Sequence, residues 1–309
     1  MDNVLVIGSR GSKLALTQAG IVKAQLELLD PAIGVRIEVV KTSGDVKSEP
    51  LSVIGGKGVF TKELEDALLA RRIDLAVHSL KDLPTIVPEG LTIAAMMKRE
   101  DPRDALVLSR RQTTANASLR DLPRGASVGT SSPRRLAQLK YLRRDLDIKD
   151  LRGNIDTRLR KLDEGQYDAL ILACAGLRRL EMENRITVAL PASEMLPAVG
   201  QGALGLETRA DDEHTNMTVA KLDHKFSRLA CTAERAFLRS LGGGCQLPIA
   251  AYAIVREKHI RLDGLIAEPQ GLRIVRDRIV GRLDEAEQLG AALAEQLLAQ
   301  GGNELLASD

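Results

Sequence analysis

The sequence predicts an α/β protein with two doubly wound parallel sheets, followed by a small α+β unit with an antiparallel sheet. Short apolar runs typical of buried strands alternate with segments of helical spacing as far as residue 241. From residue 249 to 280 the pattern changes to consecutive strands, and a closing amphipathic helix is expected over 285–300. A length of 309 residues accommodates two or three domains at roughly 150 residues each.

The first α/β unit opens with a buried strand over 3–8 and a helix over 13–29. Thr61 is a suitable N-cap for a helix over 62–71, with Glu63 and Glu65 in its first turn. Segment 43–58 is rich in Gly, Ser and charge and is expected to be a mobile loop. The other strands expected in this unit cover 35–41, 73–77 and 91–97.

The second unit follows a linker at 98–105 and repeats the alternation of strands and helices. Its expected strands cover 104–109, 126–129, 146–150 and 167–176, and its expected helices begin near Ser132 and Asp156. Strand 204–209 and a helical stretch over 218–241 then lead to the C-terminal strands.

Composition excludes several classes of protein. The net charge of +2 argues against a chain coated in one sign of charge, and the aromatic content of 2% is low for a protein that stacks on rings. The N-terminus does not resemble a signal peptide, and no run approaches the roughly 18–20 apolar residues of a membrane span. Three widely spaced cysteines and four scattered histidines predict neither disulfides nor a metal site, so a cytoplasmic protein is expected.

Arginines gather at one expected helix start. Arg134 and Arg135 follow Pro133, which suits the first helical position, so both lie in the first turn, where the helix dipole disfavours cations. Residues 128–161 hold ten Lys or Arg against four Asp, a net of +6. Two interpretations stay open: a small polyanionic ligand held by arginine forks, or arginines exposed to solvent.

Two further residues carry candidate chemistry. Asp82, after an expected strand and beside Lys81, could stabilise positive charge on a substrate, or could form a local salt bridge or turn before Pro84. Cys245 follows three glycines, which let a bulky group approach the backbone, and could be a nucleophile or an attachment point. Cys174, in an apolar run, and Cys231, in a helical one, are expected to be structural.

At these residues the chain resembles the hydroxymethylbilane synthase, or porphobilinogen deaminase, family. The resemblance rests on eight motifs in the family's order, which span nearly the whole chain: SRGSKLALTQ (9–18), GGKGVFTKELE (55–65), DLAVHSLKDLP (74–84), EDPRDALV (100–107), VGTSSPRR (128–135), LRGNIDTRL (151–159), LPAVGQGALG (196–205) and GGGCQLPI (242–249).

The resemblance implies two domains like those of type II periplasmic binding proteins and a third domain that carries the cofactor. Domain 1 would cover 1–97 and 203–220, domain 2 would cover 103–196, and domain 3 would cover 224–309. The implied cofactor is a dipyrromethane joined by a thioether to Cys245. The implied reaction condenses four porphobilinogens head to tail, with loss of ammonia, and then hydrolyses the chain to hydroxymethylbilane.

The resemblance also implies roles for individual residues. Asp82 would be the catalytic carboxylate that holds charge developing on the pyrrole nitrogens, and no metal would take part. Lys57, Phe60 and Ser79 would lie near the site, the first two in or beside a lid at 43–58. Asp150 could weaken carboxylate affinity locally, and Lys149 receives no role. The residues expected to bind cofactor or substrate carboxylates are Arg10, Ser12, Lys81, Thr130, Ser131, Ser132, Arg134, Arg135, Arg152, Gly153, Arg158, Arg179 and Gln201.

Two alternatives remain at this point. A non-enzymatic two-domain module of the periplasmic-binding-protein fold could bind small anions, but it would need neither Cys245 nor Asp82. An RNA-binding protein would need a broader basic face, and aromatic residues if it bound single strands. The resemblance favours a monomer that acts on porphobilinogen and binds neither nucleic acid nor membrane.

Overall fold

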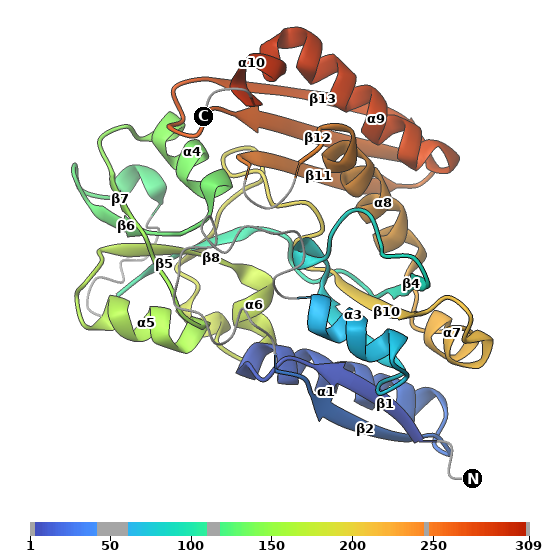
Figure 1. Ribbon diagram of the computed structural model, residues 1–309. Coiled ribbons are helices and arrows are strands. Elements are labelled where there is room, and N and C mark those ends of the chain that lie inside the picture. Colours follow the sequence, from blue (N-terminus) through green and yellow to red (C-terminus); the bar gives the residue numbers. More distant parts are fainter. Residues whose placement is uncertain (1–3, 42–60, 110–117, 244–246, 307–309) are drawn as a thin grey trace. The chain divides into compact units, whose positions relative to one another are not determined.

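The computed structural model describes residues 4–41, 61–109, 118–243 and 247–306 (Figure 1). The chain forms two compact units. Unit 1 consists of residues 1–100 and 203–229, and unit 2 consists of residues 101–202 and 230–309. No helix among the described residues is long and apolar enough to cross a membrane.

Unit 1 is built on a mixed sheet with the strand order β2-β1-β3-β10-β4. Strands β1, β2 and β3 are parallel, whereas β10 runs antiparallel to both β3 and β4. The bounds of the strands are β1 (Val4–Ser9), β2 (Gly34–Val39), β3 (Leu75–Ser79), β4 (Leu91–Met96) and β10 (Leu204–Arg209).

Helices cover both faces of this sheet, as the alternation of side chains along a strand requires. On β1, Ile7 packs on the face of α1 (Lys13–Leu29), and Val6 packs on the opposite face with α3 (Lys62–Leu69). Gly8 also faces α3, and a Cβ there would lie 2.2 Å from Cδ1 of Ile73, so this position requires glycine. Helix α7 (Glu213–Ala220) contributes Val219 to the α1 side of the core.

Unit 2 holds a second mixed sheet, with the strand order β7-β6-β8-β5-β9. Here β6 is parallel to β7 and β8, and β5 is antiparallel to β8 and β9. The strands are β5 (Asp104–Leu108), β6 (Ser127–Gly129), β7 (Asp147–Lys149), β8 (Ala169–Ala173) and β9 (Val188–Ala189). The helices are α4 (Pro133–Leu142), α5 (Ile155–Asp163) and α6 (Cys174–Arg179), with short 3₁₀ turns at Leu119–Asp121 and Glu183–Arg185.

The expectation of purely parallel sheets is wrong, because each α/β sheet contains a reversed strand. A parallel strand needs a crossover that returns the chain to its starting edge. Strands β5 and β10 each follow a segment in which the chain passes between units, with no helix to return it, and they enter the sheet in the opposite direction.

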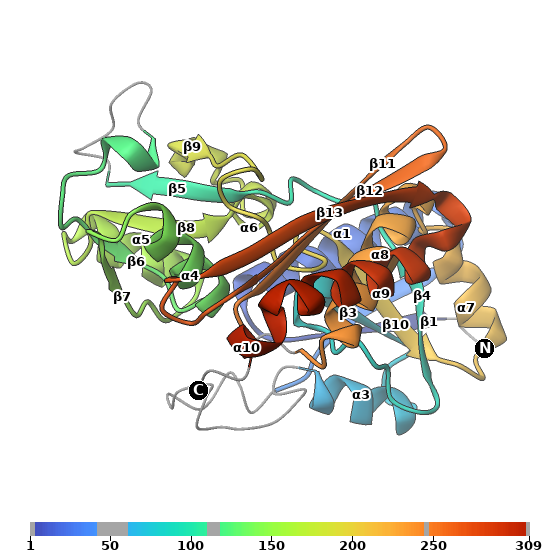
Figure 2. The ribbon, with the colours of Figure 1, turned by 90° about the horizontal axis from the view of Figure 1, so that it is seen from above.

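The C-terminal part of unit 2 is an antiparallel sheet with the order β11-β12-β13. Figure 2 shows α8 and α9 lying along it. Gly264 of β12 permits this approach, since a Cβ would lie 2.8 Å from Leu293 of α9 and 3.0 Å from Phe237 of α8. The elements are α8 (Lys225–Ser240), β11 (Ile249–Arg256), β12 (His259–Ala267), β13 (Ile274–Arg282), α9 (Ala286–Leu297) and α10 (Asn303–Leu306), with short turns at Leu283–Glu285 and Leu298–Gly302.

The predicted fold class is therefore confirmed: two α/β sheets and a three-stranded antiparallel sheet lie in the expected parts of the described chain. Two local expectations are wrong. The helical stretch over 218–241 is two helices, α7 and α8, and Cys174 begins α6 instead of lying inside a strand. The proposed division into three domains stays a prediction.

Candidate functional site

Candidate residues of unit 1 lie together at one edge of its sheet. Because β1 and β3 are parallel neighbours, their carboxyl ends share that edge. Arg10 follows β1, while Lys81 and Asp82 lie on the 3₁₀ turn η1 (Leu80–Asp82), which follows β3. Asp82 is exposed, and Arg10 and Lys81 are half-buried. The structure thus places a carboxylate and two cations at the expected edge.

Two hydroxyl groups hold the backbone around these charges. The Ser12 hydroxyl accepts a hydrogen bond from the backbone N–H of Ala15 at 3.3 Å and so caps α1. The Ser79 hydroxyl accepts from Nε2 of Gln18 at 3.0 Å, which ties the end of β3 to α1. Two other residues expected near this site, Lys57 and Phe60, lie outside the described residues, as does the predicted loop at 43–58.

The candidate residues after β6 form a turn braced against the loop after β7. Thr130 N–H donates to the carbonyl of Lys149 at 3.0 Å, and the Thr130 hydroxyl accepts from Ser132 N–H at 3.2 Å. The Ser131 hydroxyl donates to the carbonyl of Leu151 and accepts from Leu151 N–H. Ser132 is the N-cap residue of α4 by position, but its side chain makes no capping hydrogen bond. These groups shape the entrance to α4.

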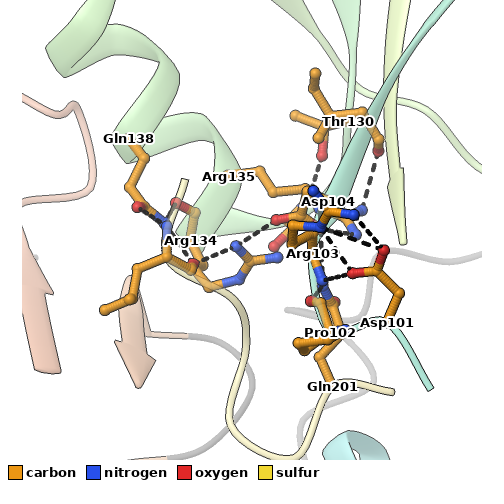
Figure 3. Close-up of polar contacts among 12 residues, drawn as sticks. Asp101, Pro102, Arg103, Asp104, Thr130, Arg134, Arg135, Gln138 and Gln201 are labelled. Atoms are coloured by element: carbon orange, nitrogen blue, oxygen red, sulfur yellow. Dashed lines mark hydrogen bonds and ion pairs between the residues drawn. The ribbon is translucent and has the colours of Figure 1, made fainter. Parts of the chain in front are cut away.

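The two arginines in the first turn of α4 are buried, and both donate hydrogen bonds to the same carboxylate (Figure 3). Asp104, the first residue of β5, is 0% exposed, and Arg134 and Arg135 are 4% and 6% exposed. Arg134 Nη1 donates to Asp104 Oδ2 at 2.7 Å, and Arg135 donates to Oδ1 from Nε at 3.0 Å and from Nη2 at 2.7 Å. Neither sequence alternative anticipated this arrangement: the arginines are not exposed to solvent, and the protein itself supplies an anion.

Asp104 is the residue that sequence reasoning missed. Burial opposes its ionisation, but the charges and hydrogen bonds of both arginines outweigh burial and hold the pKa of Asp104 below its usual range. The available signal was Arg134 and Arg135 themselves, because cations in a helix's first turn need a nearby anion. Gln201 supports the same carboxylate, since its Nε2 donates to Asp104 Oδ1 at 2.9 Å and to the Pro102 carbonyl at 2.7 Å.

Arg134 and Arg135 differ in how many of their side-chain N–H donors are used by acceptors within the protein. Arg135 gives Nε and Nη2 to Asp104, and its Nη1 donates to the Ile171 carbonyl at 3.0 Å. Arg134 uses only Nη1, for Asp104 and for the Leu196 carbonyl at 2.7 Å. Its buried Nε has no hydrogen-bond partner among the described residues. Arg134 therefore keeps donor capacity for a further acceptor.

The loop after β7 presents Arg152 and Asp150 together. Arg152 Nε donates to Asp150 Oδ2 at 2.8 Å, and the two side chains are 45% and 57% exposed. Burial of Asp150 acts to raise its pKa, yet the hydrogen bond and charge of Arg152, with contributions from Ser131 and the Leu151 backbone, outweigh burial and leave the pKa lowered. Lys149 pairs at 3.3 Å with Asp147.

Arg158 on α5 faces the same loop. Its Nε donates to the carbonyl of Gly153 at 2.6 Å. Burial and then repulsion by Arg135 lower the pKa of Arg158 to about 10, against attraction by Asp150. Gly153 has φ of +105°, and a Cβ there would also lie 2.9 Å from Thr157, so this turn requires glycine.

The remaining candidates are Arg179 and Cys245. Arg179, at the end of α6, donates from Nη2 to the Gly202 carbonyl at 2.7 Å. Cys245 lies outside the described residues. The other two cysteines, Cys174 and Cys231, are both 0% exposed. Within the part of the chain that the structure describes, no group of three or more His, Cys, Asp or Glu residues could hold a metal ion.

Solved structures match this chain at low sequence identity and with TM-scores near 0.4. The aliphatic sulphonate-binding protein of Escherichia coli matches with a TM-score of 0.41 and 14% identity over 78% of this chain and 71% of its own. The L-cystine solute receptor of Neisseria gonorrhoeae matches with a TM-score of 0.40 and 14% identity over 80% of this chain and 95% of its own.

Sequence comparison is far more specific. Residues 5–217 match the family model of the porphobilinogen deaminase dipyromethane cofactor-binding domain, and residues 228–299 match that of its C-terminal domain. Porphobilinogen deaminase of Roseiflexus sp. is 50% identical over 308 residues, which cover 99% of this chain and 100% of the relative. That of Syntrophobacter fumaroxidans is 48% identical over 306 residues, or 99% and 97%. The chain belongs to the porphobilinogen deaminase family.

Proposed function

We propose that Asp82 is the catalytic carboxylate of this chain and that Cys245 carries its dipyrromethane cofactor. The activity follows from the family: a porphobilinogen deaminase, or hydroxymethylbilane synthase, is a transferase that joins four porphobilinogens head to tail, releases ammonia in each condensation and hydrolyses the linear tetrapyrrole free. A non-enzymatic anion-binding module is not favoured, because relatives that match 99% of this chain carry the deaminase name.

The position of Asp82 is the observation that supports its role. It is an exposed carboxylate on η1, at the carboxyl edge of β3, where α/β sheets bind ligands. When ammonia leaves and a new bond forms, positive charge develops on the pyrrole nitrogens of the substrate. A carboxylate beside that charge stabilises the transition state electrostatically and can accept a proton. Asp82 is suited to both tasks.

We propose that arginines hold the acetate and propionate groups of the substrate. Arg152 is 45% exposed, and Arg158 on α5 donates to the carbonyl of Gly153, the residue that follows Arg152. Arg134 adds a buried Nε with no protein partner among the described residues, which fits a carboxylate oxygen. Arg135 uses its donors for Asp104 and the Ile171 carbonyl, so it contributes positive charge rather than free hydrogen-bond donors. Arg10, Lys81 and Arg179 supply further cationic groups, and the hydroxyl, glycine and glutamine residues hold the surrounding backbone.

The donor set fits the dipyrromethane, which is a polycarboxylate. When bound, this group supplies the pyrrole on which the first condensation takes place. Cys245 is the proposed attachment residue, because a glycine run precedes it in GGGCQLPI and because the thiols of Cys174 and Cys231 are buried. Arg134, Arg152 and Arg158 would bind its carboxylates and so orient it.

Intact mass of the purified protein under denaturing conditions tests this assignment. The expected result is an excess mass equal to one dipyrromethane, which maps to the peptide that contains Cys245 and is absent from Cys245→Ala. Cys231→Ala is the matched control and should keep the excess mass. A bare polypeptide with full deaminase activity, or an adduct on another cysteine, would overturn the assignment.

We further propose that the chain acts as a monomer in the cytoplasm. The support for both points is the family to which the chain belongs. Light scattering of the purified protein tests the first point, since one chain has a mass of 33.5 kDa. A mass of twice that value at micromolar concentration would contradict it.

A further inference from the structure

Three ionisable side chains lie buried between α3 and the sheet of unit 1, and no step above uses them. His78 on β3 is 5% exposed, Glu207 on β10 is 0% exposed, and Glu65 on α3 is 9% exposed. Burying an ionisable group is costly unless a partner compensates it. The burial of these three side chains in the core is therefore expected to serve a structural or functional role.

His78 and Glu207 form a cross-strand pair. His78 Nε2 lies 2.9 Å from Glu207 Oε2, and the pair spans β3 and β10, where His78 is opposite Gly205. On the other edge of β10, the register with β4 shifts between Leu206 and Glu207. Irregularities in strand pairing, β-bulges among them, re-aim side chains and are common beside functional sites. The backbone irregularity therefore falls at the residue that makes the buried contact.

Glu65 is the third member of this cluster. Its Oε1 and the Oε1 of Glu207 are both buried without a hydrogen-bond partner among the described residues. Burial raises the pKa of Glu65, the Thr61 hydrogen bond opposes that rise, and the charge of Glu207 adds to it. His78 and Asp66 make smaller opposing contributions. The charge of Glu207 thus disfavours the charged form of Glu65.

The nearby cation Arg209 is engaged elsewhere. Its Nη1 donates to the carbonyls of Leu68 at 3.1 Å and Ile73 at 2.6 Å, and its Nη2 contacts Asp74 and Asp212. Among the described ionisable groups of this cluster on α3, β3 and β10, His78 is the one with a hydrogen bond to Glu207.

Strand β3, which holds His78, leads directly into the turn that carries Asp82. Leu80, the first residue of η1, donates its N–H to the carbonyl of Ala203 at 3.0 Å. The Leu80 side chain packs over Gly205, where a Cβ would lie 2.9 Å from Cδ1. The turn η1 thus packs against β10 where this strand pairs with β3. The contact between His78 and Glu207 joins the same two strands next to η1.

We propose that Glu207 is a positioning residue for the deaminase reaction: through its hydrogen bond with His78, it locks β3 to β10 and so fixes the turn that presents Lys81 and Asp82. Glu65 of α3 provides the neighbouring carboxyl. This proposal rests on the role proposed for Asp82.

Paired glutamine substitutions test the proposal. Glu207→Gln removes the charge and keeps the shape, so kcat should fall at least tenfold while KM stays within twofold. Glu65→Gln makes the same change on α3, outside the contact that joins β3 to β10, and should keep kcat within twofold of the wild type. Hydrogen exchange of the Leu80 and Leu83 amides provides a readout without turnover, and it should accelerate in Glu207→Gln alone.

Thr208→Val is the matched control. Thr208 is also 0% exposed on β10, but it bonds Asn216 of α7 instead of the cluster. This variant should lose stability without loss of kcat. Should Glu207→Gln fail to fold, His78→Asn breaks the same contact from β3 and should give the same kinetic result.

Several outcomes would overturn the proposal. They are wild-type kcat and amide exchange in Glu207→Gln, an equal loss of kcat in Thr208→Val, or an equal loss in Glu65→Gln. Asp82→Asn distinguishes a failure of the role proposed for Asp82 from a failure of the role proposed for Glu207. If that variant is active, the role of Asp82 fails, whereas the amide exchange still reports whether Glu207 holds the turn.

Discussion

Asp104 Oδ2 accepts a hydrogen bond from Arg134 Nη1 at 2.7 Å, in a place where the carboxylate is 0% and the arginine 4% exposed. Arg135 and Gln201 donate to the other oxygen, so one carboxylate organises three candidate site residues. The residue at the centre of this group therefore belongs to β5 and lies 30 positions before Arg134 and 31 before Arg135.

Asp104→Asn should strongly destabilise unit 2. The substitution leaves two buried guanidinium groups without a compensating charge, and breaking a buried pair costs about 3–5 kcal/mol. Guanidinium chloride unfolding measures the loss. Asp147→Asn is the control, because Asp147 is 57% exposed beside Lys149 and such a pair contributes about 0–1 kcal/mol. Equal small losses in both variants would contradict the buried network.

The same carboxylate predicts a pH dependence of stability. The pKa of Asp104 is lower in the folded chain than its unfolded value of about 3.9, so its contribution is present above that value and is lost as pH falls toward the folded pKa. The stability difference between wild type and Asp104→Asn should therefore shrink as pH falls below about 4. Unfolding curves measured across this range check it. A difference that does not change with pH would refute the assignment.

Asp82→Asn should stop turnover and leave the fold intact. Asp82 is exposed on η1, and surface substitutions usually change stability by less than about 0.5 kcal/mol. Loss of the carboxylate should reduce porphobilinogen consumption by roughly 10²–10⁴-fold. Circular dichroism and a turnover assay measure the two effects. Wild-type turnover would exclude the charge-stabilising role.

Arg158 and Arg160 on α5 form a matched pair. Arg158 is half-buried and bonds the Gly153 carbonyl, whereas Arg160 is exposed and lies 3.5 Å from Glu164. Arg158→Leu should weaken porphobilinogen binding by at least tenfold, since a charge-assisted contact to a carboxylate contributes about 1.5–3 kcal/mol. Arg160→Leu should leave KM unchanged. Equal KM values in both variants would show that Arg158 does not bind the substrate.

Cys174 should be chemically inert in the native protein. Its thiol is 0% exposed, and burial, with Asp101 and Asp104 nearby, raises its pKa to about 12. The thiolate is the reactive form, so alkylation at about pH 8 should spare Cys174 until the chain unfolds. Peptide mass mapping before and after denaturation measures this. Native labelling at the rate of a free thiol would contradict the burial.

Much of this protein was predictable because the relevant signals are local. Helix α1 matches its expected bounds at Lys13–Leu29, and β10 matches at Leu204–Arg209, since apolar spacing and capping residues act over a few positions. The motifs likewise placed Asp82 and the arginines after strands, and a strand's carboxyl end is visible in sequence. The fold class, the family and the candidate residues were therefore accessible from the sequence alone.

The tertiary structure decided what these residues touch. Nothing in the sequence near Arg134 identifies Asp104 as its partner, because strand β5 and helix α4 meet only in the folded sheet. The reversal of β5 and β10 likewise depends on how the chain passes between units, and the contact of His78 with Glu207 spans 129 positions. Buried charges need partners, and long-range packing chooses them.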